Sequence, residues 1–377
     1  METYLLLKVL WWLLLGVLLM GLAIMVGMDM GVGTILRLVG RTDAERRVAL
    51  NIVGPHWDGN QVWFILGGGA VLAAWPLIYA TAFSGLYVVM LVLLWSMIVR
   101  PLGFEYRSKL RSPRWRGAWD WTLFVSGFVP MLVFGAAIGN MLQGVPFHFT
   151  WNLTSYYTGS FLALFNPFAI LCGLLSVSMA VYMGAVTVMN GADGAMHARA
   201  RRLALWGGVA ALILFSLGGL WVSGMSGYHL VHGPDAGAAQ TPLQQVVERA
   251  RGDWLENFRA HPILWLVPVA GYAGVLLGIG AARRNWSHFA WWLGALGWIG
   301  VIGTVGAAMF PFMMPSSSEP SQSLTVWNSS SSALTLTWML GFTLVFMPLV
   351  IWYTGWAFWV MRGKVSTQHV ESDEHAY

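Results

Sequence analysis

The chain has 377 residues, of which 57% are hydrophobic and only 10% are charged, and its mean hydropathy is +0.63. A soluble globular protein of this length needs a far larger share of charged residues on its surface. The composition therefore excludes a soluble globular protein and indicates a polytopic membrane protein. The single cysteine, Cys172, excludes an internal disulfide, and no Cys/His spacing indicates a zinc or iron–sulfur site. The net charge of +5 fits the Lys/Arg excess of cytoplasmic loops, so we expect no nucleic-acid partner.

Apolar windows predict an all-α fold with about nine membrane spans. They lie at residues 5–36, 56–80, 83–101, 119–142, 160–189, 203–224, 262–282, 288–312 and 334–361. The start, Met1 to Gly21, resembles a signal peptide, but the apolar run continues to Leu36 without an Ala-x-Ala-like site. We therefore expect a retained first helix.

The basic residues predict the orientation of the spans. The loops after the second, fourth and eighth spans contain no Lys or Arg, whereas those after the first, third, fifth, seventh and ninth are basic. The basic side should be cytoplasmic, with the N-terminus outside and the C-terminus inside. The long loop at 225–261 departs from this pattern with three arginines, but long loops translocate largely regardless of charge.

Three loops and the tail carry further structural signals. Thr42 and Glu45 have the spacing of a capping box, which predicts a short cytoplasmic helix at about 43–52. In the 225–261 loop we expect a turn and then an amphipathic outer helix from Leu243 to Phe258. The Ser/Pro-rich loop at 313–333 contains an apolar segment, 324–327, that should fold back on the bundle. The tail at 366–377 is polar and should be exposed and cytoplasmic.

Asp29 is the first candidate for chemistry, because an acid inside a membrane span is costly and marks a functional site by default. It lies between Gly27 and Gly31, a spacing that lets another helix approach closely. Two interpretations stay open: a packing residue hydrogen-bonded near the interface, or a residue with a proton or quinone role.

The densest polar run, Pro55 to Trp63, opens the second span. Pro55 favours a helix start, where the free backbone N–H groups of the first turn stabilise the carboxylate of Asp58, so a simple capping role could explain it. The same two turns carry other groups that can accept and pass protons, namely His56, Asn60 and Gln61. We favour a water-assisted proton relay. Trp63 precedes Gly67-Gly68-Gly69, which suits close helix packing better than an apolar gap for a small uncharged molecule.

Arg100 lies at the cytoplasmic end of the third span beside Glu105, Arg107 and Lys109. Such a charge cluster usually anchors the orientation, although Arg100 could pair with Asp58 across the bundle. The histidines lie in loops, in the tail or at helix entrances, where they offer no buried pair. Haem needs axial ligands at suitable depth, so we predict that this chain alone binds no haem.

Motifs along nearly the whole chain resemble subunit II of the cytochrome bd-type quinol oxidases. They are Trp11-Trp12, Asp29-Met30-Gly31, Pro55-His56-Trp57-Asp58-Gly59-Asn60-Gln61-Val62-Trp63, Ala74-Trp75-Pro76, Ala82-Phe83-Ser84-Gly85, Arg100 to Lys109, Gly139-Asn140, Leu142 to Phe147, and Pro311 to Ser317. The resemblance implies one membrane domain over 1–377, with a first four-helix bundle (about 1–143), a second (about 160–312) and a peripheral last helix (about 334–361).

The resemblance also implies a function. The chain would be the haem-free partner of a subunit I that carries two b-type haems and one d-type haem, in the inner membrane of a bacterium. Asp58 would belong to a cytoplasmic proton pathway and Trp63 to the mouth of an oxygen tunnel, and a structural quinone is associated with this subunit. Val26 stands where members often have an acid, which favours Asp58 over Asp29. A small single-helix accessory subunit and membrane lipids are further expected partners. The alternative is a stand-alone cation-coupled transporter or channel.

Overall fold

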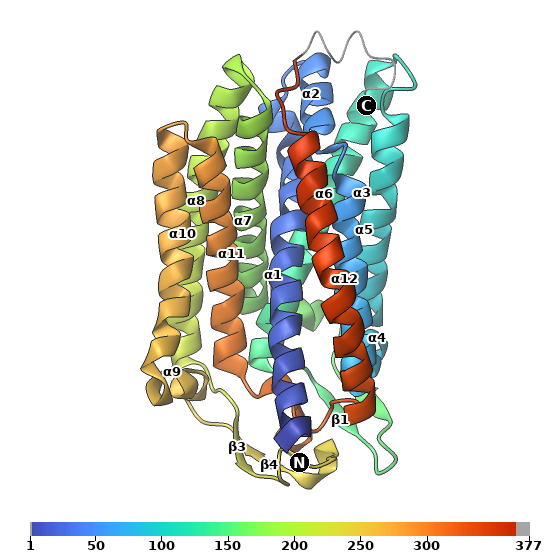
Figure 1. Cartoon of the computed structure of the whole chain (residues 1–377), viewed down its shortest axis with the longest axis vertical. Coiled ribbons are helices and arrows are strands. Elements are labelled where there is room, and N and C mark those ends of the chain that lie inside the picture. The colour runs from blue at the N-terminus through green and yellow to red at the C-terminus, as the bar shows by residue number, and fades with distance from the viewer. Residues whose placement is uncertain (1, 367–377) are drawn as a thin grey trace.

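A computed structural model describes residues 2–366 of the chain. Long helices run side by side, and short strands gather at the end that holds the N-terminus (Figure 1). The helices are α1 (Glu2–Val39), α2 (Asp43–Val53), α3 (Trp57–Ala74), α4 (Pro76–Gly85), α5 (Tyr87–Tyr106), α6 (Pro113–Gln143), α7 (Pro167–Gly191), α8 (Gly194–Gly224), α9 (Glu256–Ala260), α10 (Leu266–Arg283), α11 (Ser287–Met309) and α12 (Ala333–Val360).

The described residues contain eight helices long and apolar enough to cross a membrane, or up to nine if the bent pair α3 and α4 counts as one span. The all-helical prediction is therefore confirmed. The second span expected at 56–80 is broken in the structure, because α3 and α4 are bent by 118° at the break between them. Trp75 joins them in a non-helical conformation, as expected for a residue that precedes proline.

The core lies where α1 crosses α7. A Cβ on Gly31 would come within 1.9 Å of the carbonyl oxygen of Ala180, and one on Gly184 would meet the backbone of Gly31 at 2.4 Å. Only glycines allow this approach, so they fix the position of α1 on α7. Because α1 also packs on α3, α6 and α11, the division into two bundles stays a prediction.

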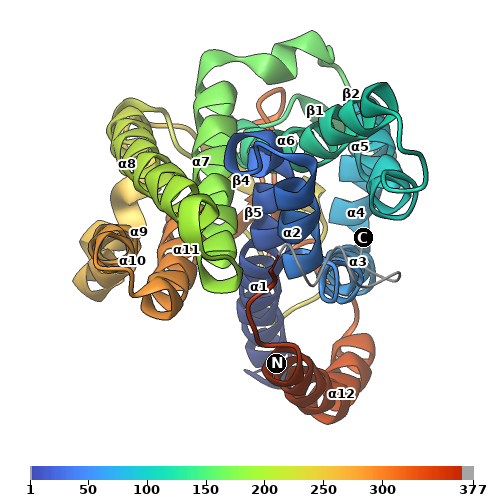
Figure 2. The ribbon, with the colours of Figure 1, turned by 90° about the horizontal axis from the view of Figure 1, so that it is seen from above.

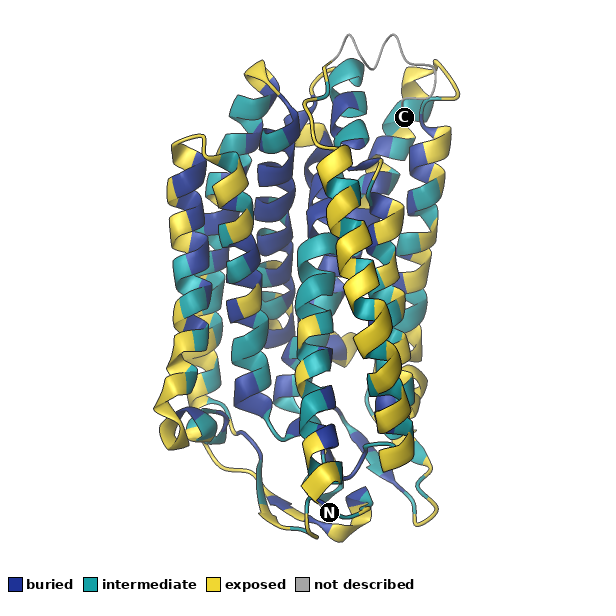
Figure 3. Cartoon of the chain, in the orientation of Figure 1, coloured by how far each residue is buried: buried dark blue, intermediate teal, exposed yellow. Residues whose placement is uncertain are grey.

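The last helix, α12, is peripheral by burial. Leu336 is its only buried residue, and Figure 3 shows most of its surface exposed, in contrast to α7. A helix face that contacts only lipid or another chain needs no polar side chains. The apolar composition of α12 fits such a face.

The loops confirm two predictions and correct one. The capping box at the start of α2 is formed in both directions. In the 313–333 loop, Leu324 and Val326 are fully buried, and the loop folds back on the bundle.

The outer helix expected from Leu243 to Phe258 is wrong, because Val246–Glu248 (β4) pairs with His229–His232 (β3) and Gly252 adopts a left-handed φ of +82°. The other hairpins join β1 (Phe147–Phe149) to β2 (Ser155–Tyr157) and β5 (Phe312–Met314) to β6 (Leu324–Thr325).

Lys8 ties these loops to α1 at the strand end of the molecule. The side chain is fully buried, and its ammonium donates hydrogen bonds of 2.9 Å to the carbonyl oxygens of Ala236, Ala238 and Trp327. Three acceptors match the three N–H bonds of an ammonium group. Lys8 therefore holds two distant loops on the first helix.

Candidate functional site

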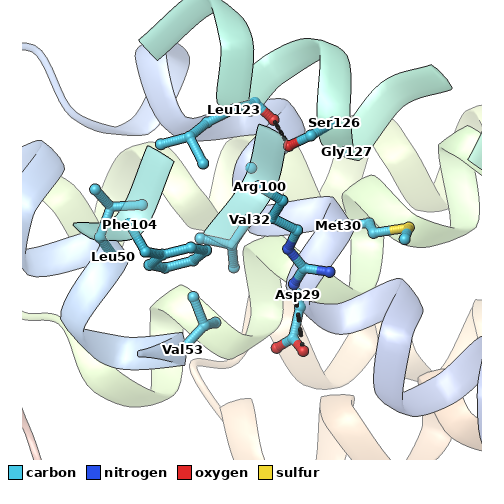
Figure 4. Close-up of a pocket in the computed structure, with 11 residues that line it drawn as sticks. Asp29, Met30, Val32, Leu50, Val53, Arg100, Phe104, Leu123, Ser126 and Gly127 are labelled. Atoms are coloured by element: carbon cyan, nitrogen blue, oxygen red, sulfur yellow. Dashed lines mark hydrogen bonds and ion pairs between the residues drawn. The ribbon is translucent and has the colours of Figure 1, made fainter. Parts of the chain in front are cut away.

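The structure brings three of the predicted residues together inside the bundle. Asp29 from α1, Asn60 from α3 and Arg100 from α5 are each only 2% exposed. The Asn60 amide donates to Oδ2 of Asp29 at 2.9 Å, and an Arg100 terminal nitrogen lies 3.5 Å from the same oxygen. In Figure 4 the guanidinium of Arg100 points at the carboxylate. The pairing of Arg100 with Asp58 is thus wrong: Arg100 faces Asp29.

A small cavity adjoins this cluster. It measures about 10 Å³, roughly the space for one water molecule. Asp29 and Arg100 line it together with apolar side chains such as Phe104 and Val53 (Figure 4). Oδ1 of Asp29 and the two terminal nitrogens of Arg100 make no hydrogen bond within the described chain. A buried carboxylate with one held oxygen and one open oxygen can take up and release a proton while its position stays fixed.

The remaining members of the polar run lie outside the cluster. Asp58 is exposed in the first turn of α3, next to the buried Trp57, because consecutive helical residues point to different faces. His56 precedes α3, and its ring stacks on Phe358 of α12 with centroids 4.0 Å apart. Gln61 is half-buried and its amide nitrogen has no partner among the described residues. Of this run, only Asn60 touches Asp29.

Trp63 packs against the first helix. A Cβ on Gly21 of α1 would lie 2.6 Å from the indole ring, so this glycine makes room for the tryptophan. By contrast, added Cβ atoms at Gly67, Gly68 and Gly69 would meet nothing within 4 Å in the described chain. The glycine run therefore brings no other helix of the described chain close, although only Gly69 is exposed and Gly67 is buried.

An ion-pair network that sequence reasoning missed lies at the α2 end of the bundle. Arg107 and Asp120 are both fully buried, and their side chains meet at 2.6 Å. Arg107 also reaches Asp43 at 2.8 Å, and Arg46 reaches Asp120 at 2.7 Å. The network joins α2, α5 and α6. Asp120 lies in a Trp-rich segment, and the composition of this segment did not indicate a buried ion pair.

Glu45 extends the charged contacts to α8. Burial alone would raise the pKa of Glu45, but hydrogen bonds from Arg199 and from the backbone N–H groups of Arg41 and Thr42 lower it below its usual value. The carboxylate therefore stays ionised and holds α2 against α8.

The described residues offer no evident metal centre. Within residues 2–366, no group of three or more His, Cys, Asp and Glu side chains is placed to hold a metal ion. The histidines in that range are half-buried or exposed.

Comparison with known proteins gives consistent matches over the whole chain. The family model for cytochrome bd terminal oxidase subunit II matches residues 7–361. The chain is 46% identical to the cytochrome bd-I ubiquinol oxidase subunit 2 of Escherichia coli (strain K12) and 45% identical to a probable cytochrome oxidase subunit 2 of Haemophilus influenzae, with 100% of each chain covered. A structure of bd oxidase from Geobacillus thermodenitrificans has a similar fold, with a TM-score of 0.69 at 14% identity, covering 94% of this chain and 98% of that one.

Proposed function

We propose that this chain, which belongs to the family of subunit II of the cytochrome bd terminal oxidases, supplies protons and oxygen to a haem-bearing subunit I. As a member of that family it is a subunit of a membrane quinol:oxygen oxidoreductase complex, and it is a multi-pass membrane protein. Membership decides against a stand-alone transporter or channel. The proposed reaction of the complex is quinol oxidation coupled to reduction of oxygen to water.

The haems belong to the partner in this proposal. Haem ligation inside a membrane bundle needs a buried His or Met facing the iron. No histidine in residues 2–366 is buried, and the ring of His56 is already stacked on Phe358. The histidines of the described residues therefore offer no axial ligand inside the bundle, and we derive no step through a haem. The two b-type haems and the d-type haem are assigned to subunit I.

The proton route rests on one observation: the buried Asp29 carboxylate lines a water-sized cavity, and Asn60 and Arg100 hold its Oδ2 while its Oδ1 has no hydrogen-bond partner in the described chain. Asp58 is the group that takes up protons, since it is exposed two residues before Asn60. Asp29 is the interior site, and Arg100 stabilises its ionised form through opposite charge. His56 and Gln61 flank the same end of α3.

The oxygen route is proposed to pass along Trp63. Its ring packs on Gly21, and one turn further along α3 the glycine run leaves space beside the helix that no other atom of the described chain fills within 4 Å of an added Cβ. A small uncharged molecule can cross such a space without displacing ordered polar groups.

The remaining assignments follow the family. We propose a heterodimer with subunit I in the bacterial inner membrane, with the basic loops and the C-terminus in the cytoplasm. The tail beyond residue 366, proposed to be polar and cytoplasmic, lies outside the described residues. A structural quinone, a small single-helix accessory subunit and lipids stay predictions.

The test compares variants in the assembled complex. Asp58→Asn and Asp29→Asn should each slow oxygen consumption at saturating quinol by tenfold or more, a typical scale for loss of a proton-transfer group. Asp193→Asn, an exposed acid at the same end of the bundle, should change nothing. Trp63→Leu should alter the dependence on oxygen but leave the quinol KM unchanged. Wild-type turnover of Asp58→Asn and Asp29→Asn at full haem content would refute the proton route.

A further inference from the structure

A group of basic side chains gathers where α8 begins and α10 ends, at the same end of the molecule as α2 (Figure 1). Arg202, Arg283 and Arg284 are exposed, and Arg201 is half-buried. Within residues 2–366, no carboxylate lies within ion-pair distance of any of these four arginines. The acid at the start of α8, Asp193, is paired with Lys364 at 2.5 Å. The four arginines, here named the α8–α10 basic patch, thus keep their charge uncompensated in the described chain.

The turn between α10 and α11 joins Arg201 of α8 to the end of α10. Asn285 has a left-handed φ of +61°, and its Oδ1 lies 3.1 Å from a terminal nitrogen of Arg201 and 3.2 Å from Nε2 of His197. Arg201 can only donate, so Oδ1 accepts. The other ring nitrogen of His197 faces the carbonyl oxygen of Met189 at 3.0 Å. Both ring nitrogens of His197 therefore contact oxygen atoms, one in this turn and one at the end of α7.

Exposed aromatic side chains lie close to the patch in the sequence, on α8 and at the start of α11. Trp206 is 73% exposed on α8, Phe289 and Trp292 are 67% and 70% exposed on α11, and the Arg284 guanidinium lies 5.5 Å from the ring centroid of Trp286. Exposed tryptophan beside arginine is typical of the membrane–water interface. Seen from this end, α8 and α10 lie on the opposite side of the bundle from α3 and α5, which carry Asp58 and Arg100 (Figure 2).

We propose that the α8–α10 basic patch binds the headgroup of an anionic phospholipid such as phosphatidylglycerol. Guanidinium groups bind phosphate oxygens in bidentate pairs, and several arginines at one interface recognise anionic headgroups. The neighbouring aromatic surface suits the glycerol and acyl region, which a free phosphate ion would leave uncovered. This site is distinct from the proton and oxygen routes proposed above.

The experiment uses the whole oxidase complex, purified and delipidated in detergent. Phosphatidylglycerol and phosphatidylcholine with identical acyl chains are titrated separately, and bound lipid is counted by native mass spectrometry. One variant removes three charges of the patch: Arg202→Gln, Arg283→Gln and Arg284→Gln. A matched control removes three exposed charges from the α5–α6 loop and the first turn of α6: Lys109→Gln, Arg111→Gln and Arg114→Gln.

The patch variant should bind the most tightly held phosphatidylglycerol on the order of a hundredfold more weakly, since each interfacial arginine contributes about fivefold. Phosphatidylcholine binding and the control variant should match wild type. Arg284→Gln alone should weaken binding about fivefold and serves where the triple variant fails to assemble.

Three outcomes would overturn the proposal. Equal losses of phosphatidylglycerol binding in the patch and control variants would indicate general electrostatic attraction of the lipid rather than a specific site. Displacement of the bound lipid by millimolar inorganic phosphate would indicate a phosphate-ion site. Binding that appears only after deletion of residues 367–377, which include Glu371, Asp373 and Glu374, would show that the acidic tail occupies the patch instead.

Discussion

Replacing Asp120 by asparagine should destabilise the α2 end of the bundle, because this change breaks a buried ion pair. Asp120 and Arg107 are both fully buried and joined at 2.6 Å. Removing one partner of a buried ion pair costs about 3–5 kcal/mol, because the other charge is left buried and uncompensated. Asp43, at 2.8 Å from Arg107 but 38% exposed, offsets part of this loss. We therefore expect about 3 kcal/mol.

The assay is thermal unfolding of the purified complex, followed by intrinsic tryptophan fluorescence at a fixed scan rate. For a chain of this size, about 3 kcal/mol corresponds to a fall in the midpoint of roughly 5 °C. The matched control is Asp193→Asn, since Asp193 and Lys364 are paired at 2.5 Å but are 67% and 61% exposed. Exposed pairs contribute about 0–1 kcal/mol, so this midpoint should hardly move. Equal shifts for the two variants would refute the reasoning from burial.

Three further predictions concern helix packing and the loops at the strand end. Gly31→Ala should prevent α1 from seating on α7 and lower the yield of assembled complex severalfold, whereas Gly16→Ala, which meets nothing within 4 Å, should not. Lys8→Met should leave three part-buried carbonyl oxygens without their ammonium donor, cost about 3 kcal/mol, and speed limited proteolysis of the 233–241 loop. A hydrogen bond from His229 to Asp253 raises the pKa of that histidine, so its contribution to stability is full below the unfolded-state pKa and is lost as pH rises through the folded-state value. The midpoint difference between wild type and His229→Gln should therefore be larger at pH 5.5 than at pH 8.5.

Each of these predictions has a result that contradicts it. Normal assembly of Gly31→Ala would mean that the two helices can separate without loss. Unchanged cleavage of the 233–241 loop in Lys8→Met would show that other contacts hold it. A midpoint difference between wild type and His229→Gln that grows as the pH rises would contradict a pKa of His229 that is raised in the folded state.

Sequence patterns predicted the features that depend on hydropathy along the chain or on residues close together in the sequence. Hydropathy gave the spans, and the Thr42/Glu45 spacing gave the start of α2, because a cap is formed by residues three apart. The bend at Trp75 was missed, although Pro76 was a local signal for it. The wrongly predicted helix at 243–258 shows the limit of periodicity, since β4 is stabilised by pairing with a strand some fifteen residues earlier.

The candidate site was predicted as a set of residues but not as an arrangement. Asp29, Asn60 and Arg100 were all identified, because polar groups in apolar spans are conspicuous. Which carboxylate meets Arg100 depends on how α1, α3 and α5 rotate about their axes, and the short apolar windows do not determine those rotations. The same reason hid Lys8 and Asp120, whose partners lie far away in the sequence. The roles of Asp58 and Trp63 stay predictions.

In the proposed mechanism, protons reach subunit I through this chain by way of Asp29. The most direct measurement is proton uptake during a single turnover of the reduced complex with oxygen, followed by a pH-indicator dye in the stopped flow. We predict that Asp29→Asn, with full haem content, takes up protons at least tenfold more slowly than wild type, while Asp193→Asn does not differ from it. Proton uptake by Asp29→Asn at the wild-type rate would contradict the account.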